Sequence, residues 1–153
     1  MDYGLFREEL LKARNSGYDE VVFLNKHGQL VEGATTNLFF VKNNILFTPA
    51  VACGCLNGIT RQIIKQCASQ AGIRCRPIRA GVSRLAQADE AFLTNSVIGV
   101  MPLTQLNGYW IGGGQTGPIT FRLLQAYQEF LIKSAFQNSK SSVAPERLNL
   151  YNA

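Results

Sequence analysis

The chain has 153 residues, of which 46% are hydrophobic and 16% are charged, and its formal net charge at pH 7 is +5. This length suits one domain with one sizeable core, and a charged fraction below the roughly 25% of average proteins suggests a surface covered by another domain or subunit. No long apolar run and no basic-then-apolar N-terminus is present, which argues against a membrane-spanning or secreted protein. We therefore expect a cytoplasmic protein that contacts no membrane.

The spacing of cysteine and histidine does not indicate a metal site. Cys53 and Cys55 form a C-x-C pair, and Cys67 and Cys75 follow at wide intervals, which matches neither a zinc site nor a small disulfide scaffold. Buried free thiols are the better interpretation. His27 stands in the turn-like sequence Lys-His-Gly, and we interpret it as a solvated turn residue.

Part of the positive charge is concentrated in the segment GIRCRPIRAGVSR, which contains Arg74, Arg76, Arg79 and Arg84. The segment lacks interleaved aromatic residues and any recognisable nucleic-acid motif. Alternation of Arg74 and Arg76 with apolar neighbours instead indicates the solvent face of a strand. We therefore expect no nucleic-acid partner.

The first half of the chain predicts one helix followed by strands. The apolar spacing of residues 5–15 is typical of a short amphipathic helix. Strands are expected at residues 21–25, 37–42 and 45–49, and Asn43-Asn44, which tolerates positive φ, predicts a two-residue hairpin between the last two. Glu32, in the stretch VEGATTNLFF, falls where the chain enters a strand, a place where a carboxylate can point into a cleft.

The second half predicts two longer helices with short strands between them. The clearest helix spans residues 57–71, with one apolar face and a glycine stop. After it we expect, in order, a strand at 76–80, a short helix at 83–90, a strand at 91–96, and a hairpin of 100–106 with 108–111 across Asn107-Gly108. Pro118 suits the first turn of a final helix through about residue 136, and residues 137–153 form a polar tail.

The loop CGCLNGIT leads directly into the helix at 57–71 and could bind an anion. A helix N-terminus presents free backbone N–H groups and the positive end of the helix dipole. The N–H groups of Ile59 and Thr60, together with the Thr60 hydroxyl, could hold a phosphate there. Asn57 and Thr60 are also ordinary capping residues, so simple capping is the alternative.

Three segments in this order and spacing, VEGATTNLFFVKNNILFTP, LNGITRQII and ADEAFLTNSVIGVMPLTQLNG, resemble the C-terminal large domain of the fold-type IV pyridoxal-phosphate enzymes. These enzymes include branched-chain and D-amino-acid aminotransferases and 4-amino-4-deoxychorismate lyase. The resemblance runs from about residue 3 to about residue 134. It implies a mixed α/β fold, with a mixed sheet or pseudo-barrel flanked by helices, and a cofactor-binding domain at 1–136 followed by the tail at 137–153.

The resemblance implies that Glu32 pairs with the pyridine nitrogen of pyridoxal 5'-phosphate. A carboxylate at that place keeps a proton on the ring, and the protonated ring is an electron sink. The other cofactor-binding residues that it implies are Leu56 packed on the ring, Ile59 and Thr60 at the phosphate, Asn95 and Ser96 on the second phosphate side, and Tyr3 at the ring hydroxyl.

Residues 94–103, TNSVIGVMPL, are most similar to the lyase, because the aminotransferases tend to carry an acidic residue near the position of Gly99. The resemblance thus implies removal of pyruvate from 4-amino-4-deoxychorismate, giving 4-aminobenzoate for folate synthesis. A branched-chain or D-amino-acid aminotransferase is one alternative, and a non-catalytic domain that assembles with a partner chain is another. The expected partners of the enzyme are a small-molecule substrate and a second copy in a homodimer.

The family's reaction also needs a lysine that binds the cofactor covalently. The resemblance places this lysine a few residues before Met1, a position outside the sequence. The family's N-terminal small domain, which adds a phosphate-binding arginine, has no counterpart here either. We therefore expect a fragment that cannot complete the catalytic cycle alone.

Overall fold

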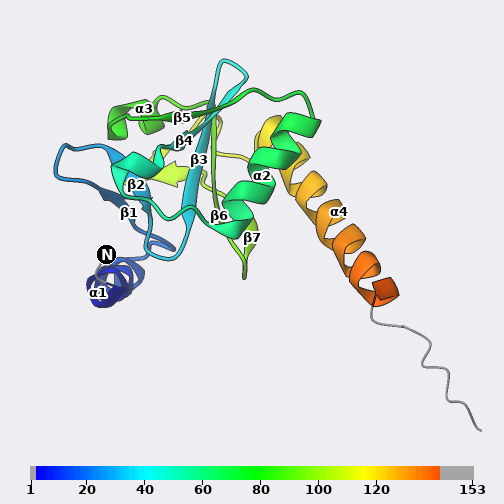
Figure 1. The fold of residues 1–153 in the computed structure, drawn as a ribbon. Coiled ribbons are helices and arrows are strands. Elements are labelled where there is room, and N and C mark those ends of the chain that lie inside the picture. The colour runs from blue at the N-terminus through cyan, green and yellow to red at the C-terminus, as the bar shows by residue number, and fades with distance from the viewer. Residues whose placement is uncertain (1–2, 142–153) are drawn as a thin grey trace, which may run out of the picture.

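The computed structural model describes residues 3–141, with side chains from residue 4 to residue 137. Figure 1 shows helices and strands in this order: α1 (Tyr3–Asn15), β1 (Val22–Leu24), β2 (Leu30–Gly33), β3 (Asn37–Lys42), β4 (Ile45–Pro49), the short 3-10 turn η1 (Val51–Cys53), α2 (Ile59–Gln70), β5 (Cys75–Ile78), α3 (Val82–Ala86), β6 (Glu90–Asn95), β7 (Gly99–Pro102), β8 (Gln105–Leu106), β9 (Tyr109–Trp110) and α4 (Pro118–Ser141). The predicted mixed α/β class is confirmed.

A mixed sheet of five strands, in the order β5-β4-β3-β6-β7, forms the centre of the fold. Only the β4–β5 pair is parallel, and α2 connects these two strands as a crossover helix. The central strand β3 reads NLFFVK because both of its faces are covered, so that Phe39 and Phe40 are both fully buried.

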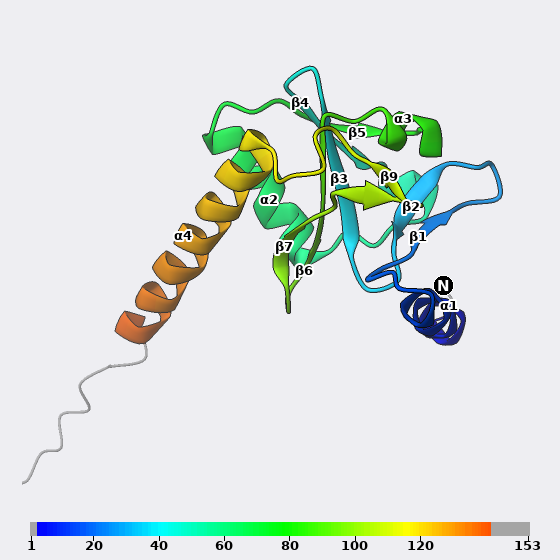
Figure 2. The same ribbon diagram turned by 180° about the vertical axis from the view of Figure 1, so that it is seen from behind.

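Successive side chains of β3 supply the two hydrophobic cores on opposite sheet faces. Phe39 belongs to the core beneath α2 and α4, where its ring stacks on Phe92 of β6 at a centroid distance of 5.0 Å. Phe40 belongs to the core on the other face, which Leu85 of α3 closes. Figure 1 and Figure 2 show α2 and α4 together on one side of the sheet, and the two helices are in contact.

Both predicted hairpin turns are confirmed. Asn43 and Asn44, with φ of 51° and 60°, join β3 to β4. Asn107 and Gly108, with φ of 50° and 84°, join β8 to β9. The continuous strand predicted at 100–106 is wrong, because β7 pairs with β6 in the main sheet while β8 belongs to a separate small sheet.

Three other elements differ from the sequence prediction. Residues 30–33 form their own strand, β2, which pairs with β1, so Glu32 lies inside a strand rather than at the entry to β3. The helix predicted at 83–90 ends at Ala86, because Asp89 and Glu90 leave it to bind the β3–β4 turn and the start of α4. Helix α4 runs to Ser141, past the predicted end at about 136.

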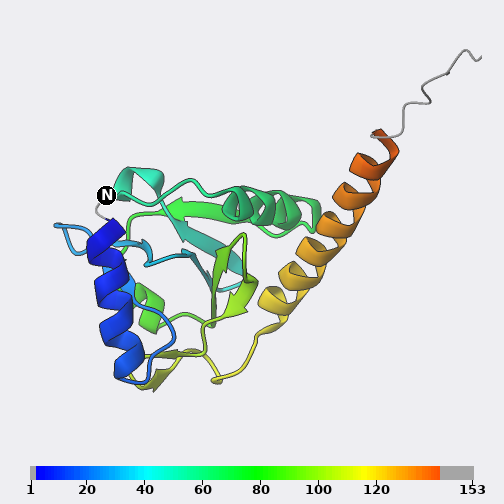
Figure 3. The same cartoon turned by 90° about the horizontal axis from the view of Figure 1, so that it is seen from below.

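The two terminal helices lie on opposite sides of the fold, as Figure 3 shows, and α4 projects beyond the sheet. Helix α1 has the predicted amphipathic pattern only in part, because Leu10 is buried whereas Leu5 and Leu11 are about half exposed. In the part of the chain that the structure describes, no helix is both long enough and apolar enough to cross a membrane.

Candidate functional site

A cavity of about 450 Å³ lies where three parts of the fold meet. These parts are the turn from β2 to β3, the N-terminus of α2, and the turn from β6 to β7. The structure brings most of the predicted site residues to this cavity, namely Glu32, Leu56, Ile59, Thr60, Asn95 and Ser96. Tyr3 begins α1, but its side chain lies outside the described residues.

Glu32 is buried, with 6% of its surface exposed, yet it lines the cavity. Its Oε2 accepts hydrogen bonds from Asn37 Nδ2 and from the backbone N–H of Leu56, both at 2.9 Å. Asn37 Nδ2 also donates to Leu56 O at 2.8 Å and thus ties the loop to the strand. Within the described residues, Oε1 accepts no hydrogen bond, so one carboxylate oxygen is available to a ligand.

Burial raises the pKa of Glu32, and the Leu56 N–H and the nearby Arg61 charge oppose this rise. No ion pair with Glu32 occurs within 4.0 Å among the described side chains. The carboxylate is therefore costly to ionise in the ligand-free protein, and a cation placed against Oε1 would offset that cost.

The N-terminus of α2 presents unpaired backbone donors to the cavity. Its N-cap is Gly58, which has no side chain to cap the helix, and the first helical bond runs from Gln62 N to Gly58 O at 3.1 Å. The N–H groups of Ile59 and Thr60 precede that bond. The alternative of simple side-chain capping by Asn57 is wrong, because Asn57 Oδ1 accepts from Arg61 Nη1 at 2.7 Å.

Asn95 and Ser96 close the opposite rim of the cavity. The Asn95 carboxamide accepts from the backbone N–H groups of Val97 and Ile98 at 2.9 and 2.8 Å and donates to Thr35 O at 3.0 Å. This side chain therefore fixes two turns against each other. The hydroxyl of Thr94, one residue earlier, is buried without a hydrogen-bond partner among the described residues, and Thr94 also lines the cavity.

Arg61 is a residue that the sequence reasoning missed. It is only 2% exposed, and its guanidinium donates to Thr48 Oγ1 at 3.3 Å, to Asn57 Oδ1 at 2.7 Å and to Pro49 O at 3.0 Å. These bonds join β4 to the loop that carries Leu56. The available signal was an arginine on the apolar-rich helix segment GITRQII, where its side chain must either reach solvent or be hydrogen-bonded.

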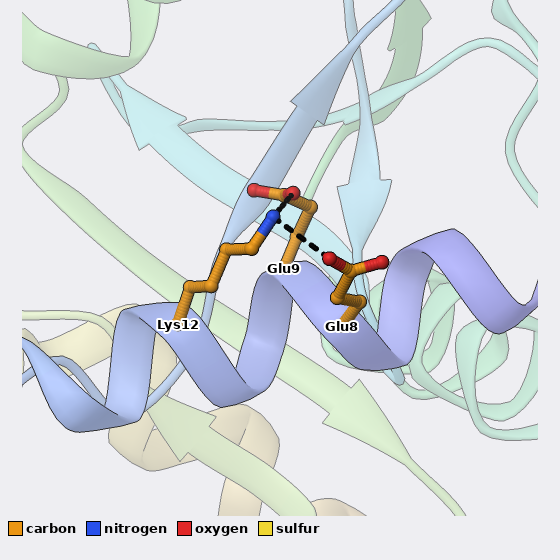
Figure 4. A network of polar contacts seen from close by, with 3 residues as sticks. All are labelled: Glu8, Glu9 and Lys12. Carbon is orange, nitrogen blue, oxygen red and sulfur yellow. Dashed lines mark hydrogen bonds and ion pairs between the residues drawn. The ribbon is translucent and has the colours of Figure 1, made fainter.

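None of the lysines with a described side chain lines the cavity. Lys12, which lies nearest to the N-terminus, contacts Glu8 at 3.0 Å and Glu9 at 2.8 Å on the solvent side of α1, as Figure 4 shows. These two carboxylates raise the pKa of Lys12. The interpretation of Lys12 as a solvated surface residue is confirmed. Across the same residues, no cluster of three or more His, Cys, Asp and Glu could hold a metal ion.

Residues 1–106 match the protein-family model described as amino-transferase class IV. The chain is 37% identical over 118 residues to a branched-chain-amino-acid aminotransferase of Pseudomonas aeruginosa, and this match covers 77% of the chain and 38% of that protein. A solved branched-chain aminotransferase from Escherichia coli aligns with a TM-score of 0.77 and 37% identity over 82% of this chain and 43% of its own.

A second solved relative is a branched-chain aminotransferase from the source abbreviated T.th., and its structure contains pyridoxamine 5'-phosphate. It aligns with a TM-score of 0.80 and 31% identity, covering 83% of this chain and 42% of its own. The chain thus spans less than half the length of each of these relatives.

Proposed function

Because the chain belongs to the aminotransferase class IV family, we propose that its cavity binds pyridoxal 5'-phosphate and forms the cofactor-binding half of an enzyme. The observation that carries this proposal is the arrangement around Glu32. A buried carboxylate with one available oxygen stands on one side of the cavity, and a helix N-terminus with free N–H groups borders the same cavity.

The chemistry of the cavity suits the two polar ends of this cofactor. A carboxylate complements a protonated ring nitrogen, and free helical N–H groups complement a phosphate. The cavity volume lies within the roughly 300–1,000 Å³ that small-molecule sites occupy. The unpartnered Thr94 hydroxyl supports a polar occupant as well, because buried polar atoms are normally hydrogen-bonded.

The proposed role of Glu32 is to keep a proton on the ring nitrogen. When bound, the cofactor withdraws electrons from the substrate carbon next to the amine, and ring protonation strengthens this withdrawal. Asn37 and the Leu56 N–H fix the orientation of the Glu32 carboxylate by occupying Oε2. Water has limited access to this carboxylate, so its charge acts strongly on a ring placed beside it.

The remaining predicted residues receive roles that agree with their positions. Leu56 is 58% exposed in the ligand-free chain and offers an apolar surface on which a ring can pack. Ile59 and Thr60 offer their N–H groups to the phosphate. The Asn95 carboxamide is already committed to Thr35, Val97 and Ile98, so Asn95 would act by holding its turn, and Ser96 would offer a hydroxyl. A role for Tyr3 at the ring hydroxyl stays a prediction.

For the complete enzyme we propose transamination of a branched-chain amino acid, because the relatives with 33–38% identity carry that description. This revises the preference for the lyase that the sequence alone suggested. Aminodeoxychorismate cleavage is the second candidate, and the observation that favours it is the segment TNSVIGVMPL at the cavity rim. We further propose that the covalent lysine comes from outside the described residues and that the enzyme is a homodimer.

The two candidates are separated by products. A chain that includes the covalent lysine is incubated with cofactor and either leucine plus 2-oxoglutarate or 4-amino-4-deoxychorismate. Transamination predicts glutamate, whereas the lyase predicts pyruvate and 4-aminobenzoate. Pyruvate without glutamate would overturn the aminotransferase assignment, and neither product would favour a non-catalytic partner domain.

A further inference from the structure

A second carboxylate, that of Glu20, is bound to the turn that forms one wall of the cavity. Glu20 lies in the loop between α1 and β1 and is partly buried. Its Oε1 accepts from the N–H of Ala34 at 3.1 Å, and its Oε2 accepts from the hydroxyls of Thr35 at 3.3 Å and Thr36 at 3.1 Å. Neither the sequence motifs nor the cavity lining includes Glu20.

The turn that Glu20 binds joins the strand of Glu32 to the strand of Asn37. Gly33 N donates to Thr36 O at 2.7 Å across this turn, and residues 33–36 all line the cavity. The turn therefore sets the relative position of two groups that meet at the Glu32 carboxylate. A shift of the turn would move the cavity wall and the Glu32–Asn37 hydrogen bond together.

Gly33 shows how closely Glu20 approaches the turn. A Cβ atom on Gly33 would stand 2.1 Å from Thr36 Oγ1 and 3.1 Å from Glu20 Cδ. Any larger residue at position 33 would therefore push the Thr36 hydroxyl away from the carboxylate. The absence of a side chain here has a packing reason, since the backbone of Gly33 has no positive φ.

The same turn continues the hydrogen-bonded chain to the opposite rim. Thr35 O accepts from Asn95 Nδ2 at 3.0 Å, and Asn95 holds the β6–β7 turn through Val97 and Ile98. Among the described side chains, no cation lies within 4.0 Å of Glu20. Its charge is thus directed at the neutral donors of the turn, where charge-assisted hydrogen bonds are stronger than neutral ones.

We propose that Glu20 is a positioning residue that holds the Ala34–Thr36 turn, and through Thr35 the Asn95 turn, in the conformation that binds the cofactor phosphate and ring. This inference rests on the proposed function. Glu20 acts through the turn and touches no ligand itself. Its effect is therefore on the affinity of the cavity rather than on a chemical step.

The test uses Glu20→Gln, which keeps the size of the side chain but replaces a charged acceptor by a neutral amide. Asp19→Asn is the matched control, because it removes the adjacent charge at an exposed position. In the ligand-free chain, we expect the hydrogen exchange of the Ala34 amide and of the Asn95 carboxamide to accelerate in Glu20→Gln alone. We also expect the Kd for pyridoxamine 5'-phosphate to rise about 5- to 30-fold, as the loss of charge-assisted bonds predicts.

A double-mutant cycle with Thr36→Val keeps the proposal falsifiable if Glu20→Gln folds poorly. Thr36→Val removes one donor while preserving shape, so it alone should weaken binding about 2- to 5-fold, and the double variant should lose less than the product of the single losses. Faster exchange with an unchanged Kd would mean a purely structural role and would overturn the proposal. Unchanged exchange would overturn it as well.

Failure of the proposed function has a different signature. If the wild-type chain bound no pyridoxamine 5'-phosphate, cofactor binding by this cavity would be refuted. The exchange measurement in the ligand-free chain would still decide whether Glu20 holds the turn.

Discussion

Replacing Glu32 by glutamine removes the charge of this carboxyl group while preserving its hydrogen bonds to the fold. The glutamine oxygen can accept from Asn37 Nδ2 and the Leu56 N–H, both now at 2.9 Å, which leaves the amide NH₂ facing the cavity. A bound ring would lose its charge-assisted partner and gain a neutral one. The difference between charged and neutral hydrogen bonds is about 1–3 kcal/mol, so we expect Glu32→Gln to raise the Kd for pyridoxamine 5'-phosphate roughly 10- to 100-fold.

The same substitution has the opposite effect on the ligand-free chain. Burial raises the pKa of Glu32 above its ordinary value of 4.5, so the folded chain binds more protons than the unfolded chain above that pH. Stability therefore falls as pH rises through this window, and the ionised carboxylate is a cost at neutral pH. Glu32→Gln should thus unfold at a higher urea concentration than wild type at pH 7, with the difference shrinking toward pH 4.

Two assays check this prediction, namely calorimetric titration with pyridoxamine 5'-phosphate and urea unfolding of the ligand-free chain at several pH values. Glu129→Gln, an exposed change on α4, is the control and should alter neither result. Equal affinities of wild type and Glu32→Gln would refute the assignment of Glu32 to the ring nitrogen. A Glu32→Gln chain less stable than wild type at pH 7 would refute the inferred cost of the buried charge.

Three further changes test the surroundings of the cavity. Arg61→Met should lower the unfolding free energy by roughly 2–4 kcal/mol, because it leaves buried acceptors without donors; an unchanged urea midpoint would contradict this. Glu90→Gln should cost about 1–3 kcal/mol and loosen the start of α4, where Glu90 accepts from Thr120 N and Ile119 N; unaltered exchange of those amides would count against it. The Lys42 ammonium at 2.7 Å holds the pKa of Asp89 below its ordinary 3.8, so the stability from this pair is present above that pH and is lost as pH falls. Since both side chains are partly exposed, Lys42→Met should raise the Asp89 pKa in carboxyl NMR titration and cost under about 1 kcal/mol; an unmoved pKa would exclude this ion pair.

The elements that the sequence predicted best are those whose pattern depends on local spacing. The helix at 57–71 and the strand at 37–42 were found within two residues of α2 and β3, because burial of a regular face leaves a periodic signal. Strand β2 has no such signal, since all of its short length is buried and nothing alternates. The end of α3 could not be predicted because Glu90 is drawn away by α4, some 30 residues later.

The candidate site divides in the same way. Residues within contiguous motifs, such as Glu32 and Thr60, could be recognised from their neighbours. Arg61 and Glu20 could not, because their roles consist of contacts with residues 12–16 positions away that only the fold brings together. The unpartnered hydroxyl of Thr94 is likewise a property of packing and leaves no mark in the sequence.

The central claim is that the cavity between Glu32 and the N-terminus of α2 binds the cofactor. Its most direct test is a ¹H–¹⁵N NMR titration of the isotope-labelled chain with pyridoxamine 5'-phosphate. We predict saturable shifts of the Leu56, Ile59 and Thr60 amides with one common Kd. No shifts, or shifts confined to the separate cavity beside Tyr18 and Trp110, would contradict the account.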